Sequence, residues 1–206
     1  MKMTQMLSRL VILVLFLQIY AASYATDKKF DIIQNGKSIG TATFSEATDT
    51  KLQTTSYTFQ CDYTMNIGVE IVVSDYMFST FGKDTLQSSK VVSRLNGKER
   101  FSVEQTLTED KTYKRTVNKK AIAMAQSPVI HSYIQLFSKM PLPATKVVFS
   151  EYYGKNMELK KIGENTFFLG ANGGTKTTFY YDAKGEIKKI NVVSSVGTYD
   201  MIPVRP

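Results

Sequence analysis

The stretch that decides the fold is YTFQCDYTM, residues 57–65, in which apolar and polar side chains alternate without a break. The odd positions carry the side chains of Tyr57, Phe59, Cys61, Tyr63 and Met65. The even positions carry only Thr, Gln and Asp. Because successive side chains of a β-strand point to opposite sides, this period of two predicts a strand with one buried and one solvated face.

The same pattern recurs in shorter segments, around residues 101–107, 113–117, 177–181 and 190–192. Turn signals separate the alternating segments, namely Asn35-Gly36, Asn96-Gly97, Asn172-Gly173 and, more weakly, Lys184-Gly185. The Asn-Gly pair readily adopts the positive backbone angles of a type I′ hairpin turn. The sequence therefore predicts an all-β fold, in which an antiparallel meander of about a dozen strands forms a strongly curved sheet or an incomplete β-barrel.

One strand-like segment changes the parity of its apolar residues part-way along. Val69, Ile71 and Val73 occupy odd positions, whereas Tyr76 and Phe78 occupy even positions. A β-bulge near Ser74 and Asp75 would bring both sets to one face, and bulges bend sheets. We therefore expect a bulge there.

A single segment shows helical periodicity. Ser127-Pro128 offers an N-cap and a first-turn proline, and apolar side chains then recur at helical spacing up to Phe137. We expect one short amphipathic helix over about residues 129–139, lying across the sheet or plugging one end of a barrel. A helix that binds a partner or a membrane surface is the alternative.

The first 25 residues have the composition of a secretory signal peptide. Lys2 and Arg9 precede an apolar run, and the small residues Ser23 and Ala25 occupy the positions that signal peptidase reads. We expect a single β-rich domain over residues 26–206, located in the periplasm or secreted. No later stretch approaches the roughly 20 apolar residues that cross a bilayer, so no transmembrane segment is expected in the mature chain. The charged side chains at off-face positions also disfavour an outer-membrane barrel.

The basic character of the chain is spread along its length. The net charge is +8, and Lys residues in many separate segments dominate the excess. Scattered Lys on strands and turns is typical of solvated faces and protected sheet edges. A single-strand nucleic-acid surface would combine a basic groove with stacking aromatic side chains. We therefore expect no nucleic-acid partner.

Few residues are suited to nucleophilic catalysis or to metal binding. The single Cys, Cys61, excludes an internal disulfide, and its place in the alternating strand predicts a buried thiol. A dyad of Cys61 with the single His, His131, would need an exposed thiol beside an electropositive group, which the alternation disfavours. Gly170, Gly173 and Gly174 lack the following helix of a phosphate-binding loop. We predict no catalytic residue, no metal site and no cofactor.

Paired carboxylates leave the question of an enzyme open. Candidates outside the signal are Glu70, Asp75, Glu104, Glu109, Asp110 and Glu151. Glycoside-type hydrolysis would need two of them to converge, which sequence spacing does not show, and solvent-facing charge is usual for such residues. The absence of Trp removes a common sugar-stacking side chain. A carboxylate-based hydrolase is the weaker alternative.

Several blocks of sequence occur in a familiar order, namely residues 30–40, 128–132 with 136–137, 149–154, 158–163 and 178–181. Together they resemble a family of exported bacterial proteins classified as a domain of unknown function, and FSEYYG at 149–154 is the most specific block. The resemblance implies an exported β-rich domain with no assigned activity and no catalytic residue to transfer. Lys139-Met140 departs from the family's acidic residue, so no role at that position is implied.

The concave interior of the sheet is the expected working surface. Most of the 12 Tyr, 12 Phe and 9 Met follow residue 25 and would give it an apolar, adaptable lining. The predicted ligand-binding side chains are Tyr57, Phe59, Tyr63, Met65, Tyr152 and Tyr153. We therefore predict a non-catalytic, exported cell-envelope protein that binds a lipid or other apolar molecule. The alternative function is an envelope scaffold or protein-interaction module, with a filled core and an envelope protein partner. The alternative for the FSEYYG block is a strand end whose tyrosines only pack.

Overall fold

The computed structural model describes residues 24–66, 68–124, 128–170, 174–195 and 197–205. These residues form one antiparallel sheet and a 3-10 turn, η1 (Ile134–Phe137). The strands are β1 (Tyr24–Gln34), β2 (Lys37–Asp49), β3 (Thr54–Asn66), β4 (Glu70–Gly82), β5 (Thr85–Leu95), β6 (Lys98–Leu107), β7 (Tyr113–Val117), β8 (Lys120–Met124), β9 (Val147–Ser150), β10 (Lys155–Gly163), β11 (Thr166–Gly170), β12 (Lys176–Tyr181), β13 (Ile187–Ser194) and β14 (Gly197–Pro203). The predicted signal peptide falls almost entirely outside the described residues.

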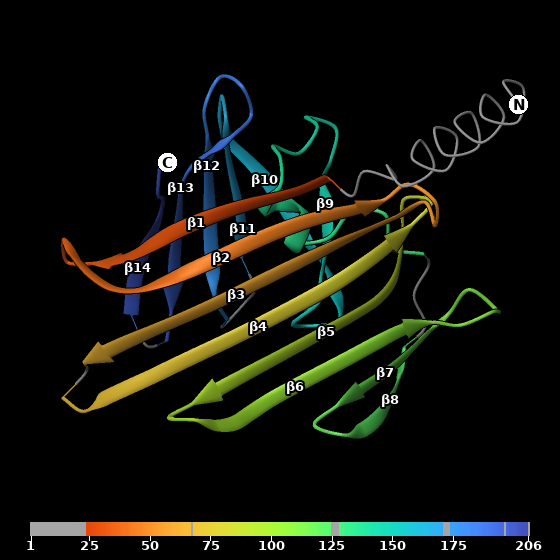
Figure 1. Cartoon of the computed structure of the whole chain (residues 1–206), viewed down its shortest axis with the longest axis horizontal. Coiled ribbons are helices and arrows are strands. Elements are labelled where there is room, and N and C mark those ends of the chain that lie inside the picture. Colours follow the sequence, from red (N-terminus) through yellow and green to blue (C-terminus); the bar gives the residue numbers. More distant parts are fainter. Residues whose placement is uncertain (1–23, 67, 125–127, 171–173, 196, 206) are drawn as a thin grey trace, which may run out of the picture.

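The sheet is a meander in which strand β1 sits in the middle. The strand order is β8-β7-β6-β5-β4-β3-β2-β1-β14-β13-β12-β11-β10-β9, so β1 pairs with both β2 and β14. Figure 1 shows β1 to β8 as one broad wall and β9 to β14 as a second wall behind it. Strands β8 and β9 do not pair with each other, so the barrel-like sheet stays open between them. The predicted all-β, antiparallel and incompletely closed fold is confirmed.

Two of the predicted hairpin turns have the backbone that their sequence favours. Asn35 and Gly36 have φ angles of 51° and 75°, and Asn96 and Gly97 have φ angles of 49° and 76°. Both residues of a type I′ turn need a positive φ, which Asn and Gly tolerate best. The predicted turn at Asn172-Gly173 lies outside the described residues.

Strand β3 presents to the interior the face that its alternation predicts. The side chains of Tyr57, Phe59, Cys61, Tyr63 and Met65 are all buried. They belong to one apolar core that receives side chains from both walls of the sheet. The core therefore lies on the concave side.

The predicted bulge near Ser74 and Asp75 is wrong. Strand β4 pairs with β3 without a shift of register, from Glu70 opposite Asn66 to Gly82 opposite Thr54. Strand β4 therefore keeps its parity and turns Asp75 inward, while the aromatic side chains at its even positions are only half-buried. The sequence pattern changes because this strand carries polar residues on its inner face.

The predicted helix over residues 129–139 is also wrong, because only η1 is helical within it. The backbone before η1 pairs with strands instead: the amide of Leu86 donates to the carbonyl of Val129 at 2.9 Å, and the amide of Phe149 donates to the carbonyl of His131 at 2.8 Å. A short isolated helix is marginal in water, whereas an edge strand offers unpaired backbone groups. Among the described residues, no helix is long and apolar enough to cross a membrane.

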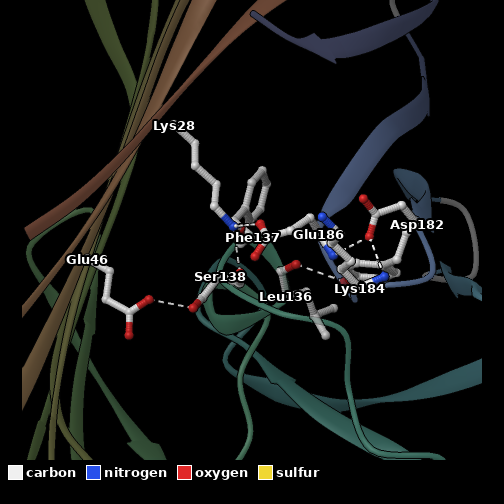
Figure 2. Close-up of polar contacts among 9 residues, drawn as sticks. Lys28, Glu46, Leu136, Phe137, Ser138, Asp182, Lys184 and Glu186 are labelled. Atoms are coloured by element: carbon white, nitrogen blue, oxygen red, sulfur yellow. Dashed lines mark hydrogen bonds and ion pairs between the residues drawn. The ribbon is translucent and has the colours of Figure 1, made fainter. Parts of the chain in front are cut away.

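Polar contacts from both walls hold η1 in place (Figure 2). The Lys28 ammonium donates to the carbonyl oxygen of Ser138 at 2.6 Å and pairs with Glu186 at 2.9 Å. The Ser138 hydroxyl donates to the carboxylate of Glu46. The Tyr181 hydroxyl donates to the carbonyl oxygen of Leu136 at 2.8 Å. The last carbonyl groups of η1 are thus partnered across the interior.

Side chains join the two ends of the sheet where backbone pairing stops. The rings of Phe101 in β6 and Tyr152, which follows β9, lie 4.6 Å apart between centroids. The Gln105 side chain donates to the carbonyl oxygen of Glu151 at 3.3 Å. The turn after β9 therefore closes the interior against β6.

Candidate functional site

The interior contains a cavity of about 270 Å³ between the two walls of the sheet. Strands β1, β3, β4 and β5 contribute one side, and strands β10 to β14 contribute the other. Its body is apolar, with side chains such as Ile32, Met77, Val91, Leu169 and Met201. Arg100, Tyr152 and Ser195 also line it and are exposed, so the cavity is reached from solvent at these residues.

Phe137 of η1 forms the floor of the cavity. Its ring lies 4.6 Å from that of Phe59 and 5.6 Å from that of Phe179, between centroids. It also stacks on Phe44 at 5.9 Å. Aromatic clusters of this kind bury large apolar areas. The interior is therefore packed on one side of Phe137 and open on the other.

A row of polar side chains crosses one wall of the cavity. Cys61, Asp75 and Ser93 face one another on adjacent strands β3, β4 and β5, and all three line the cavity. The Ser93 side chain hydrogen-bonds to the Asp75 carboxyl. Desolvation by burial and the nearby Asp62 carboxylate raise the pKa of Asp75, against the effects of Ser93 and Arg100. The Oδ1 atom of Asp75 is buried and has no hydrogen-bond partner.

Arg100 reaches the cavity through an irregularity in strand β6. Ser93 is opposite Phe101, but the next residue of β5, Arg94, is opposite Glu99, so Arg100 is the extra residue of a bulge. Bulges re-aim side chains and are frequent beside functional sites. Here the bulge places a guanidinium near the Asp75 carboxyl and at the exposed rim of the cavity.

Tyrosine hydroxyl groups supply further hydrogen-bonding groups to the lining. Tyr63 and Tyr199 hydrogen-bond to each other with ring centroids 5.2 Å apart, and burial raises the pKa of both. The Tyr153 hydroxyl accepts a hydrogen bond from the amide of Thr175 at 3.2 Å. All four residues line the cavity. These hydrogen bonds hold the hydroxyl groups of Tyr63, Tyr153 and Tyr199 in place in the cavity wall.

Four of the six predicted ligand-binding residues, Phe59, Tyr63, Tyr152 and Tyr153, line this cavity. Tyr57 instead packs against Phe44 and Phe81, with ring centroids at 6.1 Å and 5.7 Å. Met65 borders a different hollow, beside the tips of the β1–β2 and β3–β4 hairpins. Whether any of the six contacts a ligand stays a prediction.

The polar row was missed by reasoning from sequence. Neither Ser93 nor Arg100 was identified as a candidate from the sequence. Asp75 could have been identified from the sequence. It interrupts the apolar residues at odd positions of strand β4, and that interruption reflects an inward-facing carboxyl. A polar residue at an apolar position of an otherwise alternating strand is the pattern that could have identified it.

Glu151 of the FSEYYG block is fully buried beneath the turn that follows β9. The Ser79 hydroxyl donates to its Oε1 atom at 3.2 Å, while its Oε2 atom has no hydrogen-bond partner. Desolvation raises the pKa of Glu151 to about 7, against the opposing influence of the nearby Ser132 and Ser79 hydroxyls and of backbone amides, which lower it. The block therefore combines a buried acid with two tyrosines of the cavity wall.

Cys61 lines the cavity beside Asp75, but the other candidate catalytic groups do not join them there. Burial and the charge of Asp75 raise the pKa of the Cys61 thiol well above its usual range, so the reactive thiolate is disfavoured. His131 is exposed. Of the six candidate carboxylates, Asp75 alone borders this cavity. Within the described part of the chain, no three His, Cys, Asp or Glu side chains cluster as a metal site.

Comparison with known sequences places the chain in a family. Residues 30–204 match the family model described as "Domain of unknown function (DUF6134)". The chain belongs to this family. The predicted membership of a family of unknown function is thus confirmed, and no curated protein matches the DUF6134 chain with significance.

A solved structure supports the fold of the DUF6134 chain. It is the β-barrel-like protein of domain of unknown function DUF1849 from Brucella abortus, with a TM-score of 0.55. The match covers 89% of this chain and 96% of that chain, at 9% sequence identity. At such low identity the likeness establishes a shared fold and nothing about activity.

Proposed function

We propose that this protein is a non-catalytic binding protein of the cell envelope, which holds one small lipid-like or other apolar molecule in the cavity above Phe137. The observation that carries the proposal is the cavity itself. Protein interiors are packed nearly as densely as organic crystals, and large voids are few. A space of about 270 Å³ with a mainly apolar lining and a solvent-accessible rim is therefore unusual for a core that only supports a fold.

The size of the cavity limits its occupant. Pockets for drug-sized molecules have volumes of about 300–1,000 Å³, so this cavity is at the small end. At roughly 30 Å³ for each water-sized group, 270 Å³ holds about eight to ten such groups. That space suits one short acyl or alkyl chain, or one end of a longer chain.

Residence in the envelope is part of the proposal and rests on the first 25 residues. Their charged start, apolar run and small residues at 23 and 25 match a secretory signal. An exported carrier of an apolar molecule would act in the periplasm or outside the cell. A scaffold that binds an envelope protein is the second candidate, because η1 and the aromatic rings around Phe137 fill part of the interior.

Native mass spectrometry tests the proposal. The protein is purified from the periplasm without detergent, and bound material is extracted with organic solvent and analysed. We expect an additional mass that the extraction recovers. A clean apo mass, together with failure to bind 1-octanol, methyl octanoate and octanoate in isothermal titration calorimetry, would exclude the carrier and leave the scaffold.

A matched pair of variants locates the bound molecule. Val192 is buried in the cavity wall, whereas its neighbour Val193 faces solvent on the opposite side of β13. Val192→Phe adds four carbon atoms at the cavity wall, so it should narrow the cavity and reduce the additional mass, while Val193→Phe should keep it. Circular dichroism checks that both variants fold. Undiminished retention of the ligand by a folded Val192→Phe variant would place the binding site elsewhere.

A further inference from the structure

We infer that the molecule held in the cavity carries a hydrogen-bond donor, an alcohol or an amine, at one end of its apolar body, and that Asp75 accepts the hydrogen bond. This inference rests on the proposed binding function and adds the chemistry of the ligand's polar end. Three observations support it: the position of Asp75, its unpartnered oxygen and the balance of charge around the cavity.

The position of Asp75 is set by a regular part of the sheet. At Asp75, strand β4 pairs with both of its neighbours without a shift of register. Cys61 lies opposite on β3 and Ser93 lies opposite on β5. The side chain therefore points to the concave face by the same alternation that buries Val73 and Met77. A carboxyl is thus built into a row of apolar side chains at the cavity wall.

The Asp75 carboxyl is incompletely satisfied. Ser93 bonds to it, but the buried Oδ1 atom has no partner. Roughly nine of ten buried polar groups have a partner, and leaving one unpaired costs about 1–3 kcal/mol. Oδ1 can only accept while the carboxyl is ionised, so the group that completes this site is a donor.

The charge around the cavity argues against an acidic ligand. Among the described residues that line it, Asp75 and Arg100 are the charged side chains, so their charges cancel. Asp62 adds a second carboxylate close to Asp75. Arg100 is exposed at the rim, where water screens it, whereas Asp75 is desolvated. A carboxylate at the polar row would therefore meet net repulsion.

A series of probes with one alkyl body and four polar ends tests the inference. The probes are 1-octanol, octylamine, methyl octanoate and sodium octanoate, each titrated into the purified protein by isothermal titration calorimetry. Octanol and octylamine donate, methyl octanoate only accepts, and octanoate is an anion. We expect octanol or octylamine to bind at least tenfold more tightly than methyl octanoate and octanoate, the change expected for one good hydrogen bond to a charged group.

Variants of Asp75 separate the two donors. Asp75→Asn keeps an acceptor oxygen and removes the charge, so it should weaken octylamine about tenfold and leave octanol nearly unchanged. Asp75→Leu removes the acceptor and should weaken both. Asp84→Asn is the control, because Asp84 is exposed in the β4–β5 turn at a positive φ that Asn tolerates. It removes the same charge and should leave every affinity unchanged.

The outcomes distinguish this inference from the proposed function. If none of the four octyl probes binds, the binding function and the inference both fail. If the probes bind but octanoate or methyl octanoate binds as tightly as the donors do, only the inference fails. The head-group comparison is made on the wild-type protein, so it stands even if an Asp75 variant does not fold.

Discussion

Glu151 shows how one residue can couple stability to pH. Its carboxyl is fully buried, and burial raises its pKa to about 7 from the usual 4.5. The folded state therefore holds the proton more tightly than the unfolded chain. Its contribution to stability is complete below about pH 4.5 and is lost as the pH rises through about 7.

The variant Glu151→Gln should reduce this pH dependence, because Gln resembles the protonated acid and does not ionise. We expect wild-type stability to fall by on the order of 3 kcal/mol between pH 5 and pH 8.5 through this group, and the variant to lose much less. Urea unfolding at pH 5, 7 and 8.5 measures the difference. The control is Glu158→Gln, an exposed carboxyl on β10. If the free energies of unfolding of Glu151→Gln and wild type changed with pH in the same way, ionisation of Glu151 would not affect stability and the prediction would be wrong.

Residue identity also fixes how closely two strands approach. At Gly40 in β2, an added Cβ would lie 2.1 Å from the carbonyl oxygen of Asp62 and 2.5 Å from the Cα of Tyr63. Both are backbone atoms of the paired strand β3, so neither can move aside alone. Any residue with a Cβ would therefore clash with the backbone of β3, so this position requires glycine.

We therefore expect Gly40→Ala to destabilise the protein by about 3 kcal/mol or more, since overpacking that moves backbone exceeds the usual cost of 1–3 kcal/mol. The matched control is Gly163→Ala, whose Cβ would meet only the Thr166 side chain at 3.2 Å. Its expected change is below about 1 kcal/mol. The midpoints of urea unfolding of the two variants test this prediction. Equal midpoints would mean that β2 can move away from β3 to accommodate the added Cβ without loss of stability.

At the scale of elements, the strands and η1 differ in what determines them. Strand β3 follows from the alternation of residues 57–65 alone, because one buried and one wet face need only a period of two. The segment before η1 has helical spacing, yet it pairs with residues of β5 and β9 that are distant in the sequence. Backbone partners offered by remote strands outweighed a weak local preference.

The element η1 depends on Lys28, whose ammonium donates to the carbonyl oxygen of Ser138 at 2.6 Å. Lys28→Met keeps the length and apolar stem of the side chain but removes the donor. We expect a loss of about 1–3 kcal/mol in urea unfolding, because a partly buried carbonyl loses a charged donor. Lys29→Met, on the exposed opposite face of β1, should change stability by less than about 0.5 kcal/mol.

A third variant identifies which contact of Lys28 matters. Glu186 is largely exposed, so its ion pair with Lys28 should contribute little. Glu186→Gln is therefore expected to behave like Lys29→Met. If Glu186→Gln instead costs as much as Lys28→Met, the ion pair rather than the carbonyl contacts holds η1.

At the scale of the whole molecule, the open seam between β8 and β9 sets the pattern of stability. Strands β1 to β5 have ladder partners on both sides, whereas the β7–β8 hairpin is attached to the sheet through β6 alone. Local opening is easiest where backbone hydrogen bonds are exposed and buried contacts are few. The seam should therefore be the least stable part of the described sheet.

Hydrogen exchange followed by mass spectrometry tests this expectation. We expect amides of β1 to β4 to exchange slowest and those of β7 and β8 to exchange at least a hundredfold faster at pH 7, where a hundredfold is about 2.7 kcal/mol of opening free energy. Peptides from β12 and β13, which also have two partners, serve as the internal reference. Equal protection across the seam would indicate that β8 is paired in solution.

The sequence by itself determined the class of the fold, the inner face of β3 and the turns at residues 35–36 and 96–97, because alternation and positive φ angles are local properties. It also placed aromatic residues inside, of which Phe59, Tyr63, Tyr152 and Tyr153 meet at one cavity. Only the tertiary structure decided that η1 packs inside the sheet, that β8 and β9 stay apart and that Asp75 faces the cavity. Those features depend on register and on contacts between residues distant in the sequence, whose relative positions a local pattern does not contain.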